Sequence, residues 1–481
     1  MISSLALVVV IVIDQFRMDE YFRIKSKLSK SGLVRLLDQG ILYDDAHHSQ
    51  FFNVTCPGHV AISTGSDPGL HGIMFNFDYD KKLKKDTYCT ADVDNEWLEA
   101  AADNSKGNLA LGTSAKRILT TTVGDEMKML WKDDSKVVSV SAKDRAAIAL
   151  AGHAGDGVYW YAPKSNIWTT STAYSASKEL PTWLKTLNKK INGRKAPPDG
   201  GYIQSLDAII DTTDIALAAA DAFQLGKHKK TDALWVSYST HDYVSHHYGD
   251  DTKELEKAFI VEDQNIGRLV SELQKKIGNK KLIVVVTGDH GAGVDIKKHQ
   301  KQNIPGGKVD FDKEKARINK CLNLSGVGSV GFLGTSSIHL SDTVKQEDLV
   351  DARKKAKQCL IADGSIWSAF TRDEILSNQY PQVPWLKSLA KSYNPARGPD
   401  VVGVLNPYWN SSDDNTISHE TSYDYDSWVP LAVWWPGVKP RKIHRRVDIT
   451  SLAPTLSRIL ETRRPSGATY ELLTEVLDAT H

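Results

Sequence analysis

Residues 282–291 read Leu-Ile-Val-Val-Val-Thr-Gly-Asp-His-Gly, and they give the clearest indication of the fold class. A short apolar run rich in valine and isoleucine is typical of a strand buried in a parallel sheet. The run ends in Asp289 and His290, whose side chains are common metal ligands. The apolar run Leu5–Ile13 shows the same pattern, because the residue that follows it is Asp14. The sequence therefore predicts two buried strands with polar residues at their carboxyl ends.

Strand-like runs alternate with helical patterns along much of the chain. The expected strands are 5–13, 137–140, 234–238, 282–286 and 431–435, and the expected helices are 33–37, 123–131, 255–273 and 449–460. This alternation predicts an α/β fold with a doubly wound, mostly parallel central sheet flanked by helices. Sites in such sheets form at the carboxyl ends of the strands. We expect one catalytic domain over residues 1–481, with cap-like insertions at about 158–206 and 296–401, where the alternation is interrupted.

Composition excludes several classes of protein. The chain has 481 residues, 41% of them hydrophobic, with 60 Lys plus Arg against 59 Asp plus Glu, so no bulk charge favours nucleic acid. The apolar run near the N-terminus is too short to span a bilayer and lacks a preceding basic region, so it does not resemble a leader. The four cysteines are Cys56, Cys89, Cys321 and Cys359, and none has the spacing of a thiolate zinc site. Cys321 and Cys359 could pair in an oxidising compartment.

Further Asp and His residues extend the candidate metal site. Asp242 and His246 are four residues apart, and His419 lies in the stretch Ser-His-Glu-Thr-Ser-Tyr. Taken singly, Asp14 could be a helix cap, and Asp242 with His246 could be a surface helix pair. Taken together, Asp and His side chains without cysteine suit two divalent cations of intermediate hardness, such as zinc. A pair of such ions indicates an enzyme that catalyses nucleophilic displacement at a phosphorus atom.

A hydroxyl lies where such a site needs a nucleophile. Thr55 comes two residues before Pro57, which is typical of a helix start, where backbone N–H groups favour an anion. The alternative is that Thr55 only caps the helix. Cys56 is a second candidate nucleophile, but a sulfatase-type cysteine would need the pattern Cys-x-Pro-x-Arg, so we expect its replacement to be tolerated. Asn53 begins a glycosylation sequon, and a glycan there would crowd Thr55, which favours a bacterial source.

Several motifs together resemble the alkaline phosphatase superfamily, and most closely the bacterial phosphate-irrepressible alkaline phosphatases that use a threonine nucleophile. The motifs are 12–17, 55–59, 71–76, 119–125, 143–145, 152–153, 159–160, 242–246, 289–291 and 419–426, and they extend over nearly the whole chain. Two positions depart from the family pattern. Cys56 stands where glycine is common, and Glu420-Thr421 stands where Gly-Ser is usual.

The resemblance implies a role for each matching residue. One zinc ion would be bound by Asp14, Thr55, Asp289 and His290, and the other by Asp242, His246 and His419. Asn76, Lys143 and Arg145 would contact the phosphoryl oxygens. Arginine and lysine suit the extra anionic oxygen of a monoester. The alternative for Lys143 and Arg145 is a solvated surface turn.

These observations predict a two-zinc phosphomonoesterase that forms a covalent phosphothreonine and releases inorganic phosphate. A nucleotide pyrophosphatase/phosphodiesterase of the same superfamily is the alternative, and a metal-stabilised phosphate-binding protein is the non-enzymatic one. We expect small phosphorylated substrates and inorganic phosphate as partners, no nucleic acid, no membrane span, and a monomer. A periplasmic or secreted bacterial location is expected, with the leader absent from this sequence.

Overall fold

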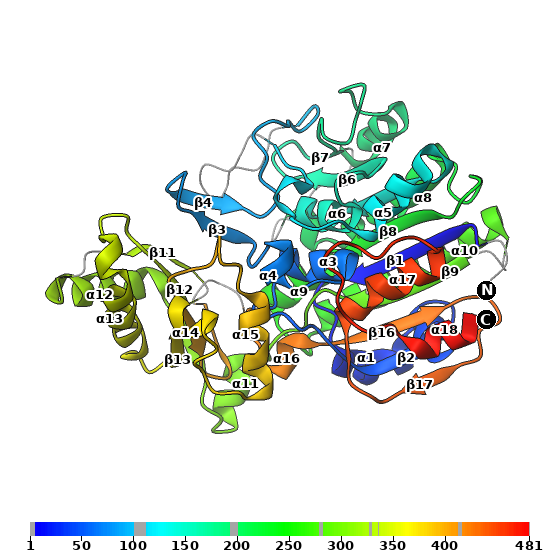
Figure 1. Ribbon diagram of the computed structural model, residues 1–481. Coiled ribbons are helices and arrows are strands. Elements are labelled where there is room, and N and C mark those ends of the chain that lie inside the picture. Colours follow the sequence, from blue (N-terminus) through cyan, green and yellow to red (C-terminus); the bar gives the residue numbers. More distant parts are fainter. Residues whose placement is uncertain are drawn as a thin grey trace.

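The centre of the molecule is a mixed sheet, to which ten strands of the described residues belong (Figure 1). The computed structural model describes residues 5–100, 112–192, 201–278, 282–326, 330–334, 336–411 and 416–480. The sheet has the order β17-β2-β16-β9-β1-β8-β5-β6-β7, and β18 pairs with β2. The strands are β1 Leu7–Ile13, β2 Ile41–His47, β5 Val137–Ser141, β6 Gly157–Ala162, β7 Ile167–Thr169, β8 Asp232–Tyr238, β9 Leu282–Gly288, β16 Trp428–Trp434, β17 Arg441–Ile443 and β18 Val447–Asp448.

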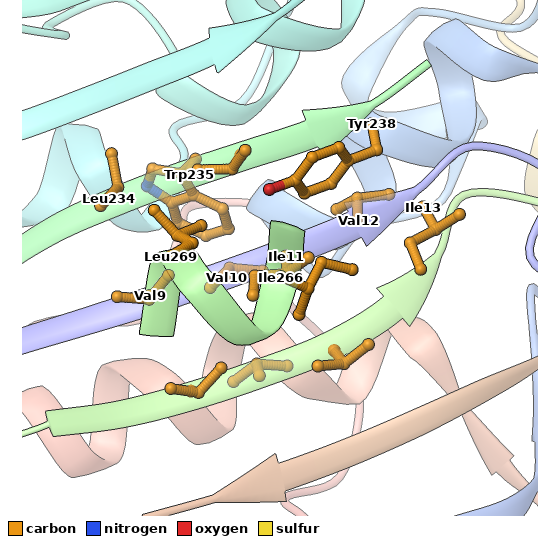
Figure 2. Close-up of a cluster of buried hydrophobic side chains, with 14 of the residues drawn as sticks. Val9, Val10, Ile11, Val12, Ile13, Leu234, Trp235, Tyr238, Ile266 and Leu269 are labelled. Atoms are coloured by element: carbon orange, nitrogen blue, oxygen red, sulfur yellow. The ribbon is translucent and has the colours of Figure 1, made fainter. Parts of the chain in front are cut away.

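The parallel strands β9, β1, β8, β5 and β6 form the middle of this sheet, as the sequence predicts. Every residue of β1 is buried, which requires helices on both faces and explains its continuous apolar run. Figure 2 shows side chains of β1 packed with Trp235 and Tyr238 of β8 and with Ile266 and Leu269 of a helix. β16 is antiparallel to both β9 and β2.

Strand register brings the polar strand ends together. Ile13 pairs with Tyr238 on one side and with Gly288 on the other, so β1, β8 and β9 end level with one another. The next residues along the chain, Asp14 and Asp289, therefore lie at one edge of the sheet, where the site was expected.

Helices connect and cover these strands, in agreement with the predicted fold class. They are α1 Met18–Ile24, α2 Leu33–Asp38, α3 Thr55–Thr64, α4 Pro68–His71, α5 Val123–Trp131, α6 Asp144–Ala151, α7 Thr182–Asn192, α8 Leu206–Ala222, α9 Thr240–Tyr248, α10 Lys253–Ile277, α16 Asp424–Ser427, α17 Leu452–Leu460 and α18 Thr474–Thr480. α10 carries Ile266 and Leu269, the two helical residues labelled in Figure 2. The expected helix 449–460 begins with a separate 3-10 turn, Ile449–Ser451. None of the helices in the described part of the chain combines the length and the apolar character needed to cross a membrane.

The range 158–206, expected to be an insertion, contributes to the central sheet. β6 pairs in parallel with β5, and β7 pairs antiparallel with β6, so both extend one edge of the sheet. The expectation failed here because β6 is a short run rich in aromatic residues and β7, at the edge, has only three residues, so neither shows the long aliphatic run of the central strands.

The range 296–401 folds largely beside the central sheet, as a second lobe at the left of Figure 1. Its four-stranded sheet has the order β11-β12-β14-β13, and helices α12 and α13 pack on it around a separate apolar core. A disulfide between Cys321 and Cys359 joins these two helices. The elements are α11 Ile296–Lys301, β10 Gly307–Val309, α12 Phe311–Leu324, β11 Val330–Gly334, β12 Ser337–Leu340, α13 Leu349–Ile361, β13 Ile366–Thr371, α14 Arg372–Leu376, α15 Lys387–Ser392, β14 Val401–Leu405 and β15 Trp409–Ser411.

A two-stranded hairpin, β3 Phe77–Asp80 and β4 Lys85–Tyr88, lies between the central sheet and the second lobe (Figure 1). Its outer half contacts that lobe, since the Lys81 ammonium lies 2.9 Å from the Asp400 carboxylate. The hairpin therefore reaches from the central sheet to the second lobe.

Candidate active site

Three of the expected metal ligands, Asp14, Asp289 and His290, lie together at the ends of β1 and β9. His290 Nε2 is 3.5 Å from Asp14 Oδ1 and 3.3 Å from Asp289 Oδ2. All three side chains are fully buried, and neither Asp14 Oδ1 nor His290 Nε2 has a hydrogen-bond partner among the described residues. Burying such atoms without a partner is costly, so this group fits a bound cation.

The other expected ligands come from α9 and from the loop before α16. Asp242 and His246 are one helical turn apart on α9, and His246 Nε2 lies 3.1 Å from Asp242 Oδ1. His419 Nε2 lies 3.6 Å from the same oxygen. The His419 ring also stacks on His290, with 3.8 Å between ring centroids, so His290 lies within reach of both groups. The resemblance assigned His290 to the first group alone.

The hydrogen bonds of the three histidines direct their Nε2 atoms into the site. The Nδ1 atoms of His246, His419 and His290 face the backbone carbonyls of Ile417, Asn53 and Gly291 at 2.7, 2.7 and 2.9 Å. A ring that donates from Nδ1 to a carbonyl presents the lone pair of Nε2 as a metal ligand. The Nε2 atoms of His246 and His419 are only 3.2 Å apart, so a shared proton or a bound cation must lie between their lone pairs. Asp and His donors in this arrangement suit zinc.

Lys143 supplies a buried positive charge between the two groups. Its Nζ is 2.6 Å from Asp14 and 2.6 Å from Asp242, and the residue is 3% exposed, so the solvated-turn alternative is wrong for this side chain. Burial works against its charge, but Asp14 and then Asp242 raise the pKa of Lys143 above its ordinary value. Burial and the neighbouring Asp289 raise the pKa of Asp14 well above its ordinary value. Burial lowers the pKa of His290 to about 3, against the effect of Asp289, which keeps the ring neutral as a metal ligand must be.

Thr55 is the first residue of α3, as the position of Pro57 predicts. The N-cap of this helix is Val54, so the alternative that the Thr55 hydroxyl serves only as a cap is wrong. Thr55 is 1% exposed, and its Oγ1 lies 3.4 Å from the Lys143 ammonium. A hydroxyl at a helix N-terminus beside a cation is placed where an alkoxide would be stabilised.

Asn76 and Arg145, the other expected phosphoryl contacts, are half-buried beside Thr55 and Lys143. The Cys56 backbone N–H donates to Asn76 Oδ1 at 2.8 Å, which leaves the NH₂ group of Asn76 as a donor. Arg145 follows Lys143 by two residues in the first turn of α6 and donates to the Tyr88 hydroxyl at 3.3 Å. Both side chains therefore retain N–H donors for an anion.

The sequence did not assign roles to His59 and Gln15, which support the ligands from outside. His59 Nδ1 lies 3.1 Å from Asp289 Oδ2, and its Nε2 lies 2.8 Å from Ser237 Oγ. Gln15 donates from its backbone N–H to Asp289 at 3.0 Å and from its side chain to Asp242 at 3.1 Å. Their positions in the sequence could have indicated these roles, because His59 comes one helical turn after Thr55 and Gln15 directly follows Asp14.

Other expectations about this region change with the structure. Cys56 forms a disulfide with Cys89, so it carries no thiol that could act as a nucleophile. Asn53 is fully buried and donates to the Thr421 carbonyl at 2.7 Å, so it is no site for a glycan. Glu420 has a φ of 115°, a region that favours glycine, which explains why glycine is usual there in the family it resembles.

Comparisons with known proteins identify relatives of the whole chain. A model of the family described as type I phosphodiesterase / nucleotide pyrophosphatase matches residues 8–426. Alkaline phosphatase PafA of Elizabethkingia meningoseptica is 29% identical over 522 residues, covering 98% of this chain and 94% of that protein. Alkaline phosphatase PhoV of Synechococcus elongatus is 27% identical over 526 residues, covering 98% and 92%. A crystal structure of wild-type PafA matches with a TM-score of 0.89 at 28% identity, covering 98% of this chain and 99% of that one.

The similarity extends over nearly the whole chain in sequence and, with PafA, in fold. It supports a phosphomonoesterase of the alkaline phosphatase superfamily. The matched residues, 8–426, include every expected ligand from Asp14 to His419. The chain belongs to the type I phosphodiesterase / nucleotide pyrophosphatase family of the alkaline phosphatase superfamily.

Proposed function

We propose that this protein is a two-zinc phosphomonoesterase that transfers the phosphoryl group of its substrate to Thr55 and then to water. The observation that carries the proposal is the position of the Thr55 hydroxyl. It lies at the N-terminus of α3, 3.4 Å from the Lys143 ammonium, at the sheet edge where two groups of Asp and His residues converge.

Each group of side chains would hold one metal ion. Asp14, Thr55, Asp289 and His290 would bind the first, and Asp242, His246 and His419 the second. When bound, the two zinc ions lower the pKa of the Thr55 hydroxyl and of a water molecule and neutralise charge on the leaving oxygen.

The protein side chains then carry out the two displacements. In the first, the Thr55 hydroxyl loses its proton and Oγ1 bonds to phosphorus as the bond from phosphorus to the leaving oxygen breaks, and the leaving oxygen takes up a proton in its place. In the second, a water molecule loses a proton and its oxygen attacks phosphothreonine, while Thr55 Oγ1 leaves, takes up a proton, and inorganic phosphate is released. Lys143, Arg145 and Asn76 donate to the nonbridging oxygens, where charge accumulates in both transition states.

Lys143 and Arg145 favour monoesters as substrates. A monoester presents three nonbridging oxygens with two negative charges, whereas a diester replaces one of them by an ester oxygen with its substituent. Two cations near Thr55 match the monoester better, because each charge-assisted hydrogen bond needs an anionic partner. A nucleotide pyrophosphatase/phosphodiesterase stays the alternative, favoured by the description of the matching family. A phosphate-binding protein without turnover has no need of the buried Thr55 hydroxyl.

Initial rates on two substrates with the same leaving group test the proposal. We expect kcat/KM for 4-nitrophenyl phosphate to exceed that for methyl 4-nitrophenyl phosphate, because only the monoester pairs fully with the two cations. A preference for the diester would favour the phosphodiesterase alternative. Binding of inorganic phosphate without hydrolysis of either ester would favour the binding protein.

We further infer a periplasmic or secreted location in a bacterium. The two disulfides, Cys56–Cys89 and Cys321–Cys359, support it, because such bonds persist in oxidising compartments. Small phosphorylated compounds and inorganic phosphate are the proposed partners, and the protein is proposed to act as a monomer. Cell fractionation and light scattering of the purified protein test these two points, and a cytosolic or dimeric protein would contradict them.

A further inference from the structure

The β3–β4 hairpin links two of the side chains proposed to contact the phosphoryl group, Asn76 and Arg145, to the helix that begins at Thr55. Asn76 immediately precedes β3, and Cys89 immediately follows β4, so the two residues form the base of the hairpin. The Cys89 backbone N–H donates to the Asn76 carbonyl at 3.0 Å and closes this base. The base therefore fixes the backbone position from which the Asn76 side chain extends.

A disulfide joins this base to the helix of the proposed nucleophile. Cys56, the residue after Thr55, is bonded to Cys89. The Cys56 backbone N–H donates to Asn76 Oδ1, so helix and hairpin are connected twice at the same place. Because its oxygen is engaged by Cys56, the Asn76 amide is held with its NH₂ group free to donate. The disulfide and this hydrogen bond together fix both the place and the orientation of that donor.

A second connection runs from the hairpin to Arg145. Tyr88, the last residue of β4, donates its hydroxyl proton to Asp144 at 2.7 Å and accepts a hydrogen bond from Arg145 at 3.3 Å. Asp144 also accepts from the Thr90 hydroxyl at 3.2 Å. The Tyr88 ring is buried in a core cluster with Cys56 and Cys89. Arg145, which is half-buried, is thus held by a tyrosine whose own position depends on the hairpin.

The hairpin is held from both lobes. On the side of the central sheet, Asp80 lies 3.9 Å from Arg117, and Phe77 packs against the buried cluster that contains Tyr88. It is a separate two-stranded sheet, and two strands alone are marginally stable. Asp78, near its base, contacts His339 of the second lobe, and Lys81, at its outer end, contacts Asp400. Helix α3 is buried along its entire length, so the core fixes the helix, and the disulfide fixes the hairpin to it.

We propose that Cys56, Cys89 and Tyr88 are positioning residues, whose disulfide and hydroxyl hold Asn76 and Arg145 against the phosphoryl group that Thr55 attacks. This inference rests on the proposed function, and it goes beyond it by assigning a role to a disulfide beside the nucleophile. It also reverses the expectation that loss of Cys56 is tolerated.

Paired variants test the role of the disulfide. Misplacing a substrate contact by about 1 Å can cost about 100-fold, so we expect Cys56→Ala/Cys89→Ala to lower kcat/KM for 4-nitrophenyl phosphate by about 10- to 100-fold. In an Asn76→Ala/Arg145→Ala background the same double substitution should cost less than about twofold, because both contacts that it misplaces are already absent. An equal cost in both backgrounds would show a purely structural role and overturn the proposal. Cys321→Ala/Cys359→Ala is the matched control, and its activity should be unchanged.

Tyr88→Phe tests the connection from the hairpin to Arg145. It can still test the proposal if the variant without the Cys56–Cys89 disulfide does not fold. It removes one hydroxyl and retains the buried ring. We expect about a tenfold loss of kcat/KM in the wild type, as for one misaligned charged contact, and almost none in an Arg145→Ala background. Equal losses in the two backgrounds would overturn the role of Tyr88.

Amide hydrogen exchange separates this inference from the proposed function. Without the disulfide, the amides of Asn76 to Cys89 should exchange faster, whereas the Cys321→Ala/Cys359→Ala control should leave them unchanged. If the wild type proved inactive on monoesters, the proposed function would fail, and exchange would still decide whether the disulfide holds the hairpin. Unchanged exchange in Cys56→Ala/Cys89→Ala would overturn the inference whatever the substrate.

Discussion

Replacing Lys143 by alanine should impair the hydrolysis of phosphate monoesters far more than that of diesters. The Lys143 ammonium is 3.4 Å from Thr55 Oγ1, so a phosphorus atom attacked by this oxygen brings its nonbridging oxygens within reach of the same ammonium. The residue is 3% exposed, and water cannot readily take the place of its charge. A phosphate monoester carries two negative charges on its nonbridging oxygens, so the ammonium pairs with a strongly anionic oxygen. A diester carries only one such charge, because an ester group takes the place of one oxygen.

The expected loss follows from the value of one buried charge-assisted hydrogen bond. Such a bond contributes about 1.5–3 kcal/mol, and each 1.36 kcal/mol corresponds to about tenfold in rate. Lys143→Ala should therefore lower kcat/KM for the monoester by about 10- to 100-fold. The loss of kcat/KM for the diester should be smaller, at about tenfold or less. Arg145→Ala should act in the same direction but less strongly, because Arg145 is half-buried and partly solvated.

The assay is kcat/KM on 4-nitrophenyl phosphate and methyl 4-nitrophenyl phosphate for the wild type, each single variant and the double variant. Zinc content is measured for each, since Lys143 also contacts Asp14 and Asp242 and a loss of metal would affect both substrates. Lys128→Ala is the control, because its ammonium pairs with Asp156 and with no proposed site residue. Equal losses on the two esters, at full zinc content, would refute the argument that these cations select monoesters.

Three further predictions follow from the same site and from its surroundings. Metal analysis should find about two zinc ions per chain, and activity should disappear on exhaustive chelation and return with Zn²⁺; full activity after chelation would contradict this. Thr55→Ala should abolish nearly all turnover in steady-state assays, while Thr55→Ser should keep a measurable part, because a hydroxyl nucleophile remains. The hydrogen bond to Asp125 raises the pKa of His153 above its ordinary value of 6.5. The protonated pair therefore stabilises the folded state fully below about pH 6.5, and this stabilisation is lost as the pH rises through the raised pKa. Urea unfolding of His153→Gln should accordingly show a destabilisation of less than about 1 kcal/mol at pH 6 that shrinks towards pH 9, and a constant difference would argue against the pair.

Strand ends were the part of the site that could be predicted from sequence. A buried parallel strand leaves a continuous apolar run, so Asp14, Asp289 and His290 stand out as the first polar residues after it. The pair Asp242 and His246 stands out by its helical spacing. His419 carries no such local signal, since its loop joins the site only through the fold. It entered the candidate set as a histidine alone, and its assignment to the second ion came from the resemblance to a family.

Other features depend on distant contacts that local patterns do not contain. β6 and β7 were missed because β6 is a short aromatic run and β7 an edge strand of three residues, and neither shows the long aliphatic runs of the central strands. The Cys56–Cys89 disulfide depends on how the hairpin returns to α3, which no spacing in the sequence encodes. The same holds for Tyr88, whose hydroxyl meets Arg145 across 57 residues of chain. The buried charge of Lys143 likewise became evident only from its two carboxylate partners.

The central claim is that Thr55 becomes phosphorylated during turnover, and trapping the intermediate tests it most directly. The enzyme would be mixed with a phosphate monoester, quenched in acid within one turnover, digested and examined by mass spectrometry. The account predicts phosphate on Thr55 in the peptide that contains the Thr-Cys-Pro-Gly-His sequence, and none in Thr55→Ala treated in the same way. Phosphate on another residue, or monoester turnover by Thr55→Ala at the wild-type rate, would contradict it.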